Sequence, residues 1–577
     1  MKTEFLPGKW LDDAKASHRA GHFSKAVSAY QALAEAPDFP DWPLDFRVRV
    51  LDLLGAAYLQ QKDFLLGEQC LAKALALMPA LPATWSNRAL ALTQLGRFEE
   101  ALSCYEQVCA LVPKGADGYV QQADILQQMG RTADALGMYA KALVIRPDYP
   151  EAHFNRGVAL QSLGRRLEAV MAYRQAIRLK PDYAEAHNNL GVMLQETHQP
   201  KAAVASFNRS LPFRSGQGAA STHSNRGLAR QMLGDFEGAM DDFDAALAIN
   251  PEHRDGIWNK ALLLLLQGEY EKGWALHNAT PLRRDRKASK TFKTPEWLGL
   301  EPLAGQTLLI QDEQGLGDML QFGRYAVQAA AQGARVVLVV RQPLIRLMQT
   351  LPCEVQISDF SDPDPPHDLH CWLMALPLAF RTTVATIPNA PYLSADPQAA
   401  ARWAARFPHS GQLRVGLVWA GNPRRSQFNV DFVDQRRSIN LQMLTDILRV
   451  EGVEFYSLQK DADDGSIVAQ LHESPWKNRI TDWTNELDDF ADTAALIENL
   501  DLVISVDTSV LHVAGAMGKP VWLLDRFDHC WRWFPNKTSS PWYPSLRIFR
   551  QQYLGDWTHP VSEAAVALKN LAESKSA

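Results

Sequence analysis

The residues best suited to chemistry form a short segment in which a predicted strand leads directly into a predicted helix. The apolar run Leu502–Val506 is followed by Asp507, Thr508 and Ser509 and then by a helical pattern of small residues. Hydroxyl groups and free backbone N–H groups at the positive end of a helix form a site for an anion such as a phosphate. His512 lies one helical turn further and points back toward the same end. We therefore expect these four polar residues to hold a phosphorylated ligand.

A second candidate is an acidic residue at the start of another predicted helix. Gly315, Gly317 and Asp318 follow the predicted strand Thr307–Gln311 and open a helical pattern. The glycines let a ligand approach the backbone closely. The segment is neither a GxGxxG fingerprint nor a Walker A loop. Two roles remain open for Asp318, because it is either the cap of its helix or a general base that faces a ligand.

Basic side chains follow two further predicted strands. The loop after the strand that ends at Trp419 carries arginines, namely Arg424, Arg425, Arg436 and Arg437. Lys460 follows the strand VEFYSLQ. A guanidinium donates paired hydrogen bonds to a diphosphate, and a lysine adds a point charge. We expect Arg437 and Lys460 to reach the same anion; the alternatives are a hydrated arginine loop and an ordinary surface lysine.

The elements that position these residues lie in the second half of the chain. Short apolar runs such as TLLIQ, RVVLVV, RVGLVWAG and PVWLL alternate there with amphipathic helical patterns. This alternation is typical of parallel α/β sheets. We expect two Rossmann-like lobes, residues 303–400 and residues 401–577, and a ligand cleft at the carboxyl ends of their strands.

An internal repeat organises the first half. Pro79, Pro113, Pro147 and Pro181 recur every 34 residues, and Gly96, Gly130 and Gly164 keep the same step. Each period holds two amphipathic helical patterns, which predicts a tetratricopeptide solenoid over residues 1–280, because one helix pair cannot bury its apolar face alone. Lys62 and the segment Thr197-His198-Gln199 replace the turn glycine in two repeats. Residues 281–302, with six basic residues, predict a linker.

An amide side chain recurs at one position of the first helix in five repeats. These residues are Asn87, Asn155, Asn189, Asn225 and Asn259. A ladder of amides on the inner surface of a solenoid could bind an acceptor peptide through its backbone. The alternative is that each asparagine caps its helix or bridges neighbouring repeats.

Composition excludes several classes of protein. The 577 residues leave room for three or four domains, and a formal net charge of −6 gives no support to nucleic-acid binding. The six cysteines lie far apart and include no CxxC pair, so we expect reduced thiols rather than disulfides or a zinc site. No apolar run is long enough for a transmembrane segment, and the N-terminal residues lack a signal-peptide core. We expect a cytoplasmic location.

Two further features each allow two interpretations. The triplets Asp362-Pro363-Asp364 and Asp461-Ala462-Asp463 either hold a divalent cation or form polar turns. We favour turns and expect no metal. The aromatic block from Trp531 to Tyr543 either stacks on a sugar or base or packs in the core.

The motifs together carry a family resemblance. GLGDMLQFGRYA and DLVISVDTSVLHVAGAMGKPVWLL, in that order, resemble the ADP-heptose:lipopolysaccharide heptosyltransferases and their tetratricopeptide-fused relatives. The resemblance covers essentially the whole chain. It implies a GT-B fold and an inverting, metal-independent sugar transfer, with a nucleotide sugar as substrate and no cofactor. The fused relatives usually carry Asp before Trp-Arg-Trp, where this chain has Cys530.

The resemblance also implies roles for individual residues. Asp318 would deprotonate the acceptor hydroxyl. The donor diphosphate would be bound by Asp507, Thr508, Ser509, His512, Arg437 and Lys460, and the donor sugar or nucleotide would be contacted by Gly317, Asn422 and Gln459.

The predicted function is therefore that of a hexosyl- or heptosyltransferase whose solenoid selects a protein or glycan acceptor. The alternative is a repeat scaffold for protein–protein interaction with a degenerate, non-catalytic transferase module. The sequence does not identify the nucleotide base of the donor, the sugar or the acceptor.

Overall fold

The computed structural model describes residues 7–280, 290–313, 315–422, 434–460 and 465–576. They form two compact units, Met1–Thr197 and His198–Ala577, each of which we describe by itself. The division falls inside the predicted solenoid, at the segment where the turn glycine is missing.

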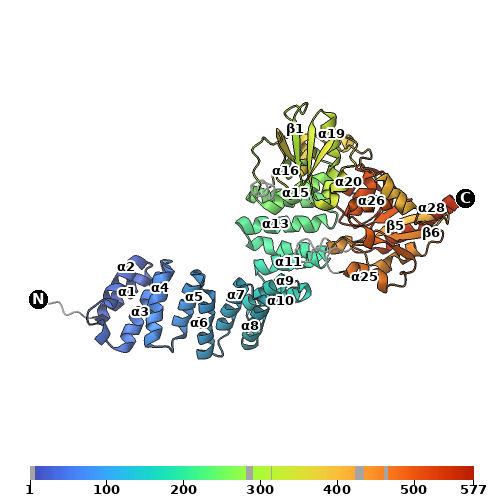
Figure 1. The fold of residues 1–577 in the computed structure, drawn as a ribbon. Coiled ribbons are helices and arrows are strands. Elements are labelled where there is room, and N and C mark those ends of the chain that lie inside the picture. Colours follow the sequence, from blue (N-terminus) through green and yellow to red (C-terminus); the bar gives the residue numbers. More distant parts are fainter. Residues whose placement is uncertain (1–6, 281–289, 314, 423–433, 461–464, 577) are drawn as a thin grey trace. The chain divides into compact units, whose positions relative to one another are not determined.

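Helices α1 to α11 make up the first unit, and consecutive helices pack in antiparallel pairs such as α3 with α4 and α7 with α8 (Figure 1). The bounds are α1 (Pro7–Arg19), α2 (Phe23–Ala34), α3 (Leu44–Gln60), α4 (Phe64–Leu77), α5 (Pro82–Gln94), α6 (Phe98–Leu111), α7 (Ala116–Gln128), α8 (Thr132–Ile145), α9 (Pro150–Ser162), α10 (Arg166–Leu179) and α11 (Ala184–Glu196). Small residues permit the close packing. A Cβ added to Gly157 of α9 would lie only 2.6 Å from the ring of Tyr173 in α10.

The turns between paired helices keep one backbone conformation whether or not they contain glycine. Gly96, Gly130 and Gly164 have φ of 73°, 76° and 70°. Lys62 and His198 occupy the same turn position in their repeats and have φ of 64° and 60°. Glycine adopts this left-handed region without a steric penalty, whereas other residues do not. The helix-turn-helix pattern of the repeat therefore overrides the local preference of these two residues.

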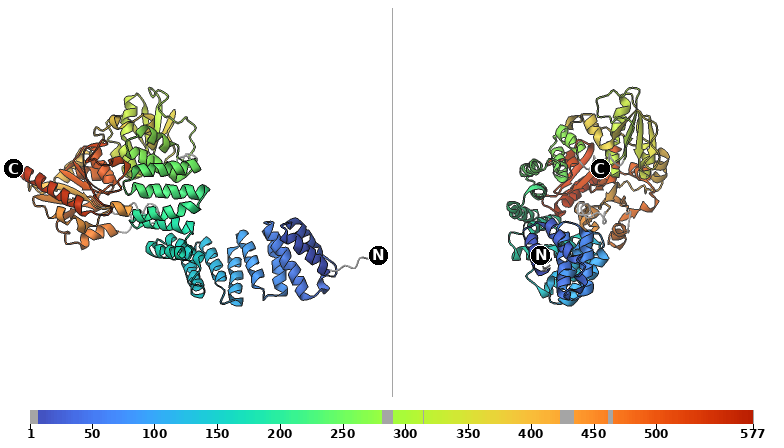
Figure 2. Two further views of the ribbon diagram at one scale, coloured as in Figure 1. Left: turned by 180° about the vertical axis from the view of Figure 1, so that it is seen from behind. Right: turned by 90° about the vertical axis from the view of Figure 1, so that its left-hand side faces the viewer.

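The second unit begins with five helices that continue the helical repeats. They are α12 (Pro200–Ser210), α13 (Gly216–Gln231), α14 (Phe236–Ile249), α15 (Arg254–Leu266) and α16 (Tyr270–Asn278). Two α/β lobes follow. Both views from the side show α15 and α16 lying directly against the lobe that contains β1 (Thr307–Gln311) (Figures 1 and 2).

The first lobe is built on a parallel four-stranded sheet in the order β3-β2-β1-β4. Leu309 in β1 lies opposite Val337 in β2 and His370 in β4. The other elements of this lobe are α18 (Leu316–Phe322), α19 (Arg324–Ala331), β2 (Arg335–Val340), α20 (Ile345–Met348), β3 (Val355–Asp359), β4 (Leu369–Trp372) and α21 (Leu376–Ala379). Helix α22 (Pro397–Ala404) leads into the second lobe and packs on α26 (Phe490–Glu498).

The second lobe contains a seven-stranded sheet in the order β10-β11-β9-β8-β5-β6-β7, in which only β10 runs antiparallel to its neighbour. Its further elements are β5 (Leu413–Val418), α24 (Thr445–Leu448), β6 (Val453–Ser457), α25 (Ser466–Glu473), β7 (Ile480–Asp482), β8 (Leu502–Ser505), α27 (Ser509–Ala516), β9 (Val521–Asp525), β10 (Ser539–Ser540), β11 (Tyr543–Arg550) and α28 (Thr558–Ser576). Short 3-10 helices, among them η8 (Trp531–Trp533), lie in the loops. Two parallel-sheet lobes after a helical repeat region confirm the predicted fold class.

The last helical repeat shares one hydrophobic core with both lobes. Tyr270 and Trp274 of α16 belong to the same cluster of buried residues as Trp531 and Trp542. The ring of Trp274 meets that of Trp531 edge to face, with centroids 5.2 Å apart. The aromatic block therefore packs in the core, and the tryptophans at 531, 533 and 542 are at most 7% exposed.

Two expectations from the sequence concern disulfide bonds between the cysteines and transmembrane helices. None of the six cysteines forms a disulfide bond. Within the part of the chain that the structure describes, no helix has both the length and the apolar character required to cross a bilayer.

Candidate functional site

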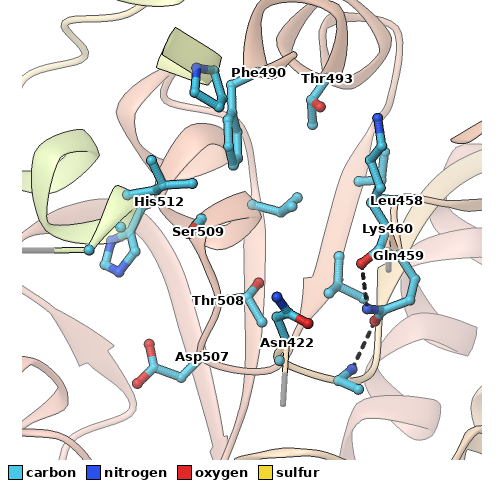
Figure 3. A pocket seen from close by; sticks show the side chains of 18 of the residues that line it. Asn422, Leu458, Gln459, Lys460, Phe490, Thr493, Asp507, Thr508, Ser509 and His512 are labelled. Carbon is cyan, nitrogen blue, oxygen red and sulfur yellow. Dashed lines mark hydrogen bonds between the residues drawn. The ribbon is translucent and has the colours of Figure 1, made fainter. Parts of the chain in front are cut away.

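A cavity of about 640 Å³ lies between the two lobes of the second unit. Its walls come from the carboxyl ends of β1, β5, β6 and β8 and from the segments that follow those strands. Each of the cleft residues predicted from the sequence lines it: Gly317, Asp318, Asn422, Arg437, Gln459, Lys460, Asp507, Thr508, Ser509 and His512. Figure 3 shows Thr508 and Ser509 facing the same space as Asn422 and Lys460. Parallel-strand topology explains the convergence, because the ends of parallel strands meet at one edge of a sheet.

The amino terminus of α27 opens into this cavity. Thr508 is the residue before the helix, its backbone is extended, and its side chain makes no capping hydrogen bond. Its Oγ1 lies 3.1 Å from Oγ of Ser505. The hydroxyl of Ser509 and the backbone N–H groups of the first turn complete a patch of donors at the positive end of the helix dipole. This is the arrangement that binds a phosphate.

His512 forms a buried wall of the same cavity. Its Nδ1 lies 2.9 Å from the hydroxyl oxygen of Tyr543, and its ring stacks on Trp533. Burial, reinforced by the positive charge of Arg532, lowers the pKa of His512 to about 3. The imidazole is therefore neutral near pH 7 and offers a hydrogen bond rather than a charge to a ligand. A Cβ added to Gly317 would lie 3.6 Å from Nε2 of His512, so the glycine permits this close approach.

Asp318 occupies the third position of α18, where it is not the N-cap residue but its side chain completes the capping box of the helix. Gly315 is the N-cap, and its backbone N–H donates to Oδ2 of Asp318 at 3.0 Å. The other carboxylate oxygen accepts a hydrogen bond from the guanidinium of Arg532, with which it forms an ion pair. The side chains of Asp318 and Arg532 are 21% and 14% exposed, so the pair lies at the cavity wall.

Arg437 is held in place by two partners. Its Nη1 donates to the carbonyl oxygen of Asp507 at 3.1 Å, and its Nη2 pairs with Asp434 at 2.8 Å. The guanidinium lies against Gly421, where an added Cβ would come within 2.5 Å of Nε. Because Asp507 precedes α27, this contact places a cation beside the amino terminus of that helix.

The remaining basic residues of the prediction divide into three groups. Lys460 lines the opposite side of the cavity and donates to the backbone carbonyl oxygen of Leu487. Arg436 is buried in an ion pair with Asp528, and burial lowers its pKa to about 10. Arg424 and Arg425 lie outside the described residues.

Gln459 and Asn422 differ in what they can offer a ligand. Oε1 of Gln459 accepts hydrogen bonds from the backbone N–H groups of Trp419 and Ala420, at 3.1 and 2.9 Å. Gln459 is 2% exposed, so its amide ties the ends of β5 and β6 together. Asn422 is exposed and lines the same cavity as Thr508.

Sequence reasoning missed two parts of the cavity wall. Arg532 lines the cavity although it belongs to the aromatic block of the core. Phe490 and Thr493 of α26 form another wall, and Asp489 caps this helix by accepting from the N–H groups of residues 491 and 492. The pattern Asp-Asp-Phe before a helical run is an N-cap signature and would have located the helix start. No local signal places Arg532 against Asp318.

The asparagines of the proposed ladder have individual roles. Nδ2 of Asn155 donates to Asp124 of the preceding repeat at 3.0 Å, and Nδ2 of Asn259 lies 3.4 Å from Oγ of Ser224. Asn189 contacts the hydroxyl of Tyr173 at 3.4 Å. Asn225 also has an interaction partner. Asn87, in contrast, makes no side-chain hydrogen bond to any residue that the structure describes. The bridging interpretation therefore applies to Asn155, Asn189 and Asn259.

The first DxD-like triplet, residues 362–364, does not line the cavity. Asp364 forms an ion pair with Lys290 at 2.7 Å, and the N–H of Asp362 donates to the carbonyl of Asp359 within a turn. The second triplet, residues 461–463, lies outside the described residues. Among the residues whose positions are described, no group of three or more His, Cys, Asp or Glu could hold a metal ion.

Family comparisons agree with this architecture. Tetratricopeptide-repeat models match residues 82–114, 123–164, 166–197 and 220–253. The model described as glycosyltransferase family 9 (heptosyltransferase) matches residues 443–524, a range that includes β6, β8, α27 and β9. The chain thus carries tetratricopeptide repeats and a family 9 glycosyltransferase domain, which confirms the predicted resemblance.

The individual proteins that this chain resembles share only a small part of its sequence. Protein FlbA of Caulobacter vibrioides is 27% identical over 387 residues, and the match covers 62% of this chain and 62% of FlbA. Among solved structures, a tetratricopeptide repeat protein of Parabacteroides merdae is 17% identical, with a TM-score of 0.35 over 42% of this chain and 93% of that one. The pilF protein of Pseudomonas aeruginosa is 15% identical, with a TM-score of 0.32 over 36% and 94%.

Proposed function

We propose that this chain, through its family 9 glycosyltransferase domain, transfers a sugar from a nucleotide-diphosphate sugar to an acceptor hydroxyl, with inversion at the anomeric carbon. The observation that carries the proposal is the convergence of an anion site and a carboxylate at one cavity. The amino terminus of α27 and the cations Arg437 and Lys460 suit a diphosphate, and Asp318 lines the same cavity.

The proposed reaction is a single displacement. Asp318 accepts the proton of the acceptor hydroxyl while that oxygen forms a bond to the anomeric carbon. The bond from this carbon to the diphosphate oxygen breaks, and the nucleoside diphosphate leaves with the electron pair. One displacement inverts the anomeric centre without a covalent intermediate. A positioned general base contributes roughly 10²–10⁴-fold to such a step.

The leaving diphosphate gains negative charge as the bond breaks. Donors that are already oriented toward that charge stabilise the transition state, and this effect usually dominates. In the proposal these donors are the hydroxyl groups of Thr508 and Ser509, the amides of α27 and the two cations. We propose that they replace a divalent cation, so that the transfer is insensitive to chelators.

The helical repeats suggest where the acceptor is recognised. Tetratricopeptide repeats generally mediate protein interactions, and an extended helical array offers a long binding surface. We propose that the solenoid recruits a protein or glycan acceptor. The six cysteines, none of them in a disulfide bond, support a cytoplasmic location, because reduced thiols persist in reducing compartments.

The decisive experiment measures donor turnover. The full chain is incubated with a panel of nucleotide sugars in the presence of EDTA, and slow donor hydrolysis is followed by release of nucleoside diphosphate. We expect Asp318→Asn to abolish hydrolysis of the active donor while the donor still binds. The double variant Thr508→Val/Ser509→Ala should weaken donor binding itself.

A matched control is Thr445→Val, because Thr445 also begins a helix of the second lobe but does not line the cavity. This control should bind and turn over the donor like the unmodified chain. Failure of every nucleotide sugar to bind at millimolar concentration would contradict the proposal and favour a repeat scaffold with a degenerate transferase module.

A further inference from the structure

The guanidinium of Arg532 touches the proposed base and also borders the proposed diphosphate site. Its Nη2 donates to Oδ1 of Asp318, and the same side chain lines the cavity formed by α27. The two residues belong to different lobes, since Asp318 lies on α18 and Arg532 on η8. The ion pair therefore spans the cleft that the donor would enter.

The other contacts of Arg532 orient it without neutralising its charge. Nε donates to the amide oxygen of Gln321, and Nη1 lies 3.1 Å from Sγ of Cys530. The guanidinium also lies over the ring of Trp531, 4.5 Å from its centroid. An amide oxygen and a thiol are weaker partners for a cation than an anionic oxygen is. Among these contacts, Asp318 is thus the main electrostatic partner of Arg532.

This pairing opposes the role proposed for Asp318. A general base must accept a proton during the reaction, and the hydrogen bond from Arg532 occupies one of its two oxygens. The other oxygen already accepts from the backbone N–H of Gly315. An oxygen of Asp318 becomes available to the acceptor hydroxyl if Arg532 gains a stronger anionic partner.

A diphosphate at α27 would be such a partner. It carries more negative charge than one carboxylate, and its oxygens suit the paired donors of a guanidinium. We infer that Arg532 is shared between Asp318 and the donor diphosphate, so that Asp318 is released as a base only after the donor has bound. The inference rests on the proposed function and assigns Arg532 a positioning role that orders the two substrates. Acceptor activation without a donor in place is thereby suppressed.

The exchange of Arg532 between its two partners can be measured without knowing which sugar or nucleotide base the donor carries. The probe is inorganic pyrophosphate, titrated calorimetrically into the full chain. In the unliganded protein Asp318 competes with the probe for Arg532, so Asp318→Asn should tighten pyrophosphate binding by about 10-fold, the scale of one charge-assisted contact. Arg532→Gln should weaken binding by a similar factor.

The double variant Asp318→Asn/Arg532→Gln distinguishes the sharing of Arg532 from a simple repulsion between Asp318 and pyrophosphate. If Asp318 acts through Arg532, Asp318→Asn has no further effect in the Arg532→Gln background. If Asp318 merely repels the probe, the tightening persists in that background and the inference is overturned. An unchanged affinity in Asp318→Asn alone also overturns it. Should Arg532→Gln fail to fold, Arg532→Lys takes its place, and the effect of Asp318→Asn should then be reduced rather than lost.

A surface ion pair in the same lobe serves as the matched control. Arg406 forms an ion pair with Glu486, with 2.6 Å between their charged atoms, and neither residue lines the cavity. Glu486→Gln should therefore leave pyrophosphate binding unchanged.

The binding measurements also distinguish the proposed function from the sharing of Arg532. If pyrophosphate and nucleoside diphosphates do not bind the unmodified chain, both proposals fail. If they bind and depend on Ser509 but not on Asp318 or Arg532, only the sharing of Arg532 fails.

Discussion

The indole Nε1–H of Trp542 donates a hydrogen bond to the hydroxyl oxygen of Tyr270, 3.1 Å away. The bond joins the last helical repeat to the second lobe inside a common core, because both side chains are at most 2% exposed. The same aromatic block carries Arg532, which pairs with Asp318, and Trp533, which stacks on His512. The end of the repeat region is therefore part of the framework that holds the cavity.

Removal of the phenol hydroxyl should destabilise this framework. Tyr270→Phe leaves the buried Nε1–H of Trp542 without its acceptor, which costs about 1–3 kcal/mol of unfolding free energy. Denaturant unfolding of the full chain measures the change. Tyr553→Phe is the control, because Tyr553 is 71% exposed, and it should leave the transition unchanged. Equal stability of the two variants would show that the hydrogen bond to Trp542 contributes nothing.

Two glycines of the first unit should respond oppositely to the same substitution. Gly157→Ala places a methyl group 2.6 Å from the ring of Tyr173, so it should destabilise the unit by about 1–3 kcal/mol through overpacking. Gly137 lies within α8 and an added Cβ meets nothing within 4 Å, so Gly137→Ala should stabilise by about 0.5–1 kcal/mol. Thermal unfolding monitored by circular dichroism compares them. Shifts of the same sign would contradict this account of repeat packing.

The asparagine ladder can be tested for structural and binding roles separately. Asn155→Ala removes a hydrogen-bond donor to the carboxylate of Asp124. Burial already raises the pKa of Asp124, so the loss of this donor should lower the stability by about 1 kcal/mol. Asn87→Ala should leave stability unchanged, because no such bond is lost. The unfolding midpoints of the two variants decide the matter. If acceptor binding is later found to depend on Asn87 without a loss of stability, that residue has the binding role.

His512 should make stability depend on pH. Its pKa is lowered from 6.5 to about 3 in the folded chain, first by burial and then by Arg532. Between these values the unfolded chain binds a proton that the folded chain does not, so stability falls as the pH decreases from about 6.5 toward 3. His512→Gln should flatten this slope in unfolding curves recorded from pH 7 to pH 4.

A residual slope in that variant is expected from His529, whose pKa is also lowered, to about 4, mainly by burial. His529→Gln is therefore the matched comparison, and the two effects should add. An unchanged slope in His512→Gln would mean that the imidazole is already protonated in the folded chain, which its environment opposes.

Local patterns alone determined the repeat architecture and the elements of both lobes. The 34-residue spacing located the helix pairs, because a helix buries its apolar face at a fixed period and the turn needs a left-handed residue. Strand ends followed by Asp318, Arg437, Lys460 and Thr508 predicted one cavity, because parallel strands deliver their carboxyl ends to the same edge. These inferences use interactions between residues that are close along the chain.

Only the tertiary structure decided which side chains meet across the cleft and in the core. Asp318 and Arg532 are far apart in the sequence, as are Arg346 of the first lobe and Asp492 of the second, which pair at 3.2 Å. The family resemblance implied a ligand contact for Gln459, and the structure shows that its amide oxygen accepts hydrogen bonds from two backbone N–H groups. Such pairings depend on how whole helices and sheets pack, and many side chains of similar type compete for each partner. The periodicity of a sequence therefore identifies its elements, while the packing of those elements selects the contacts of each charged or amide group.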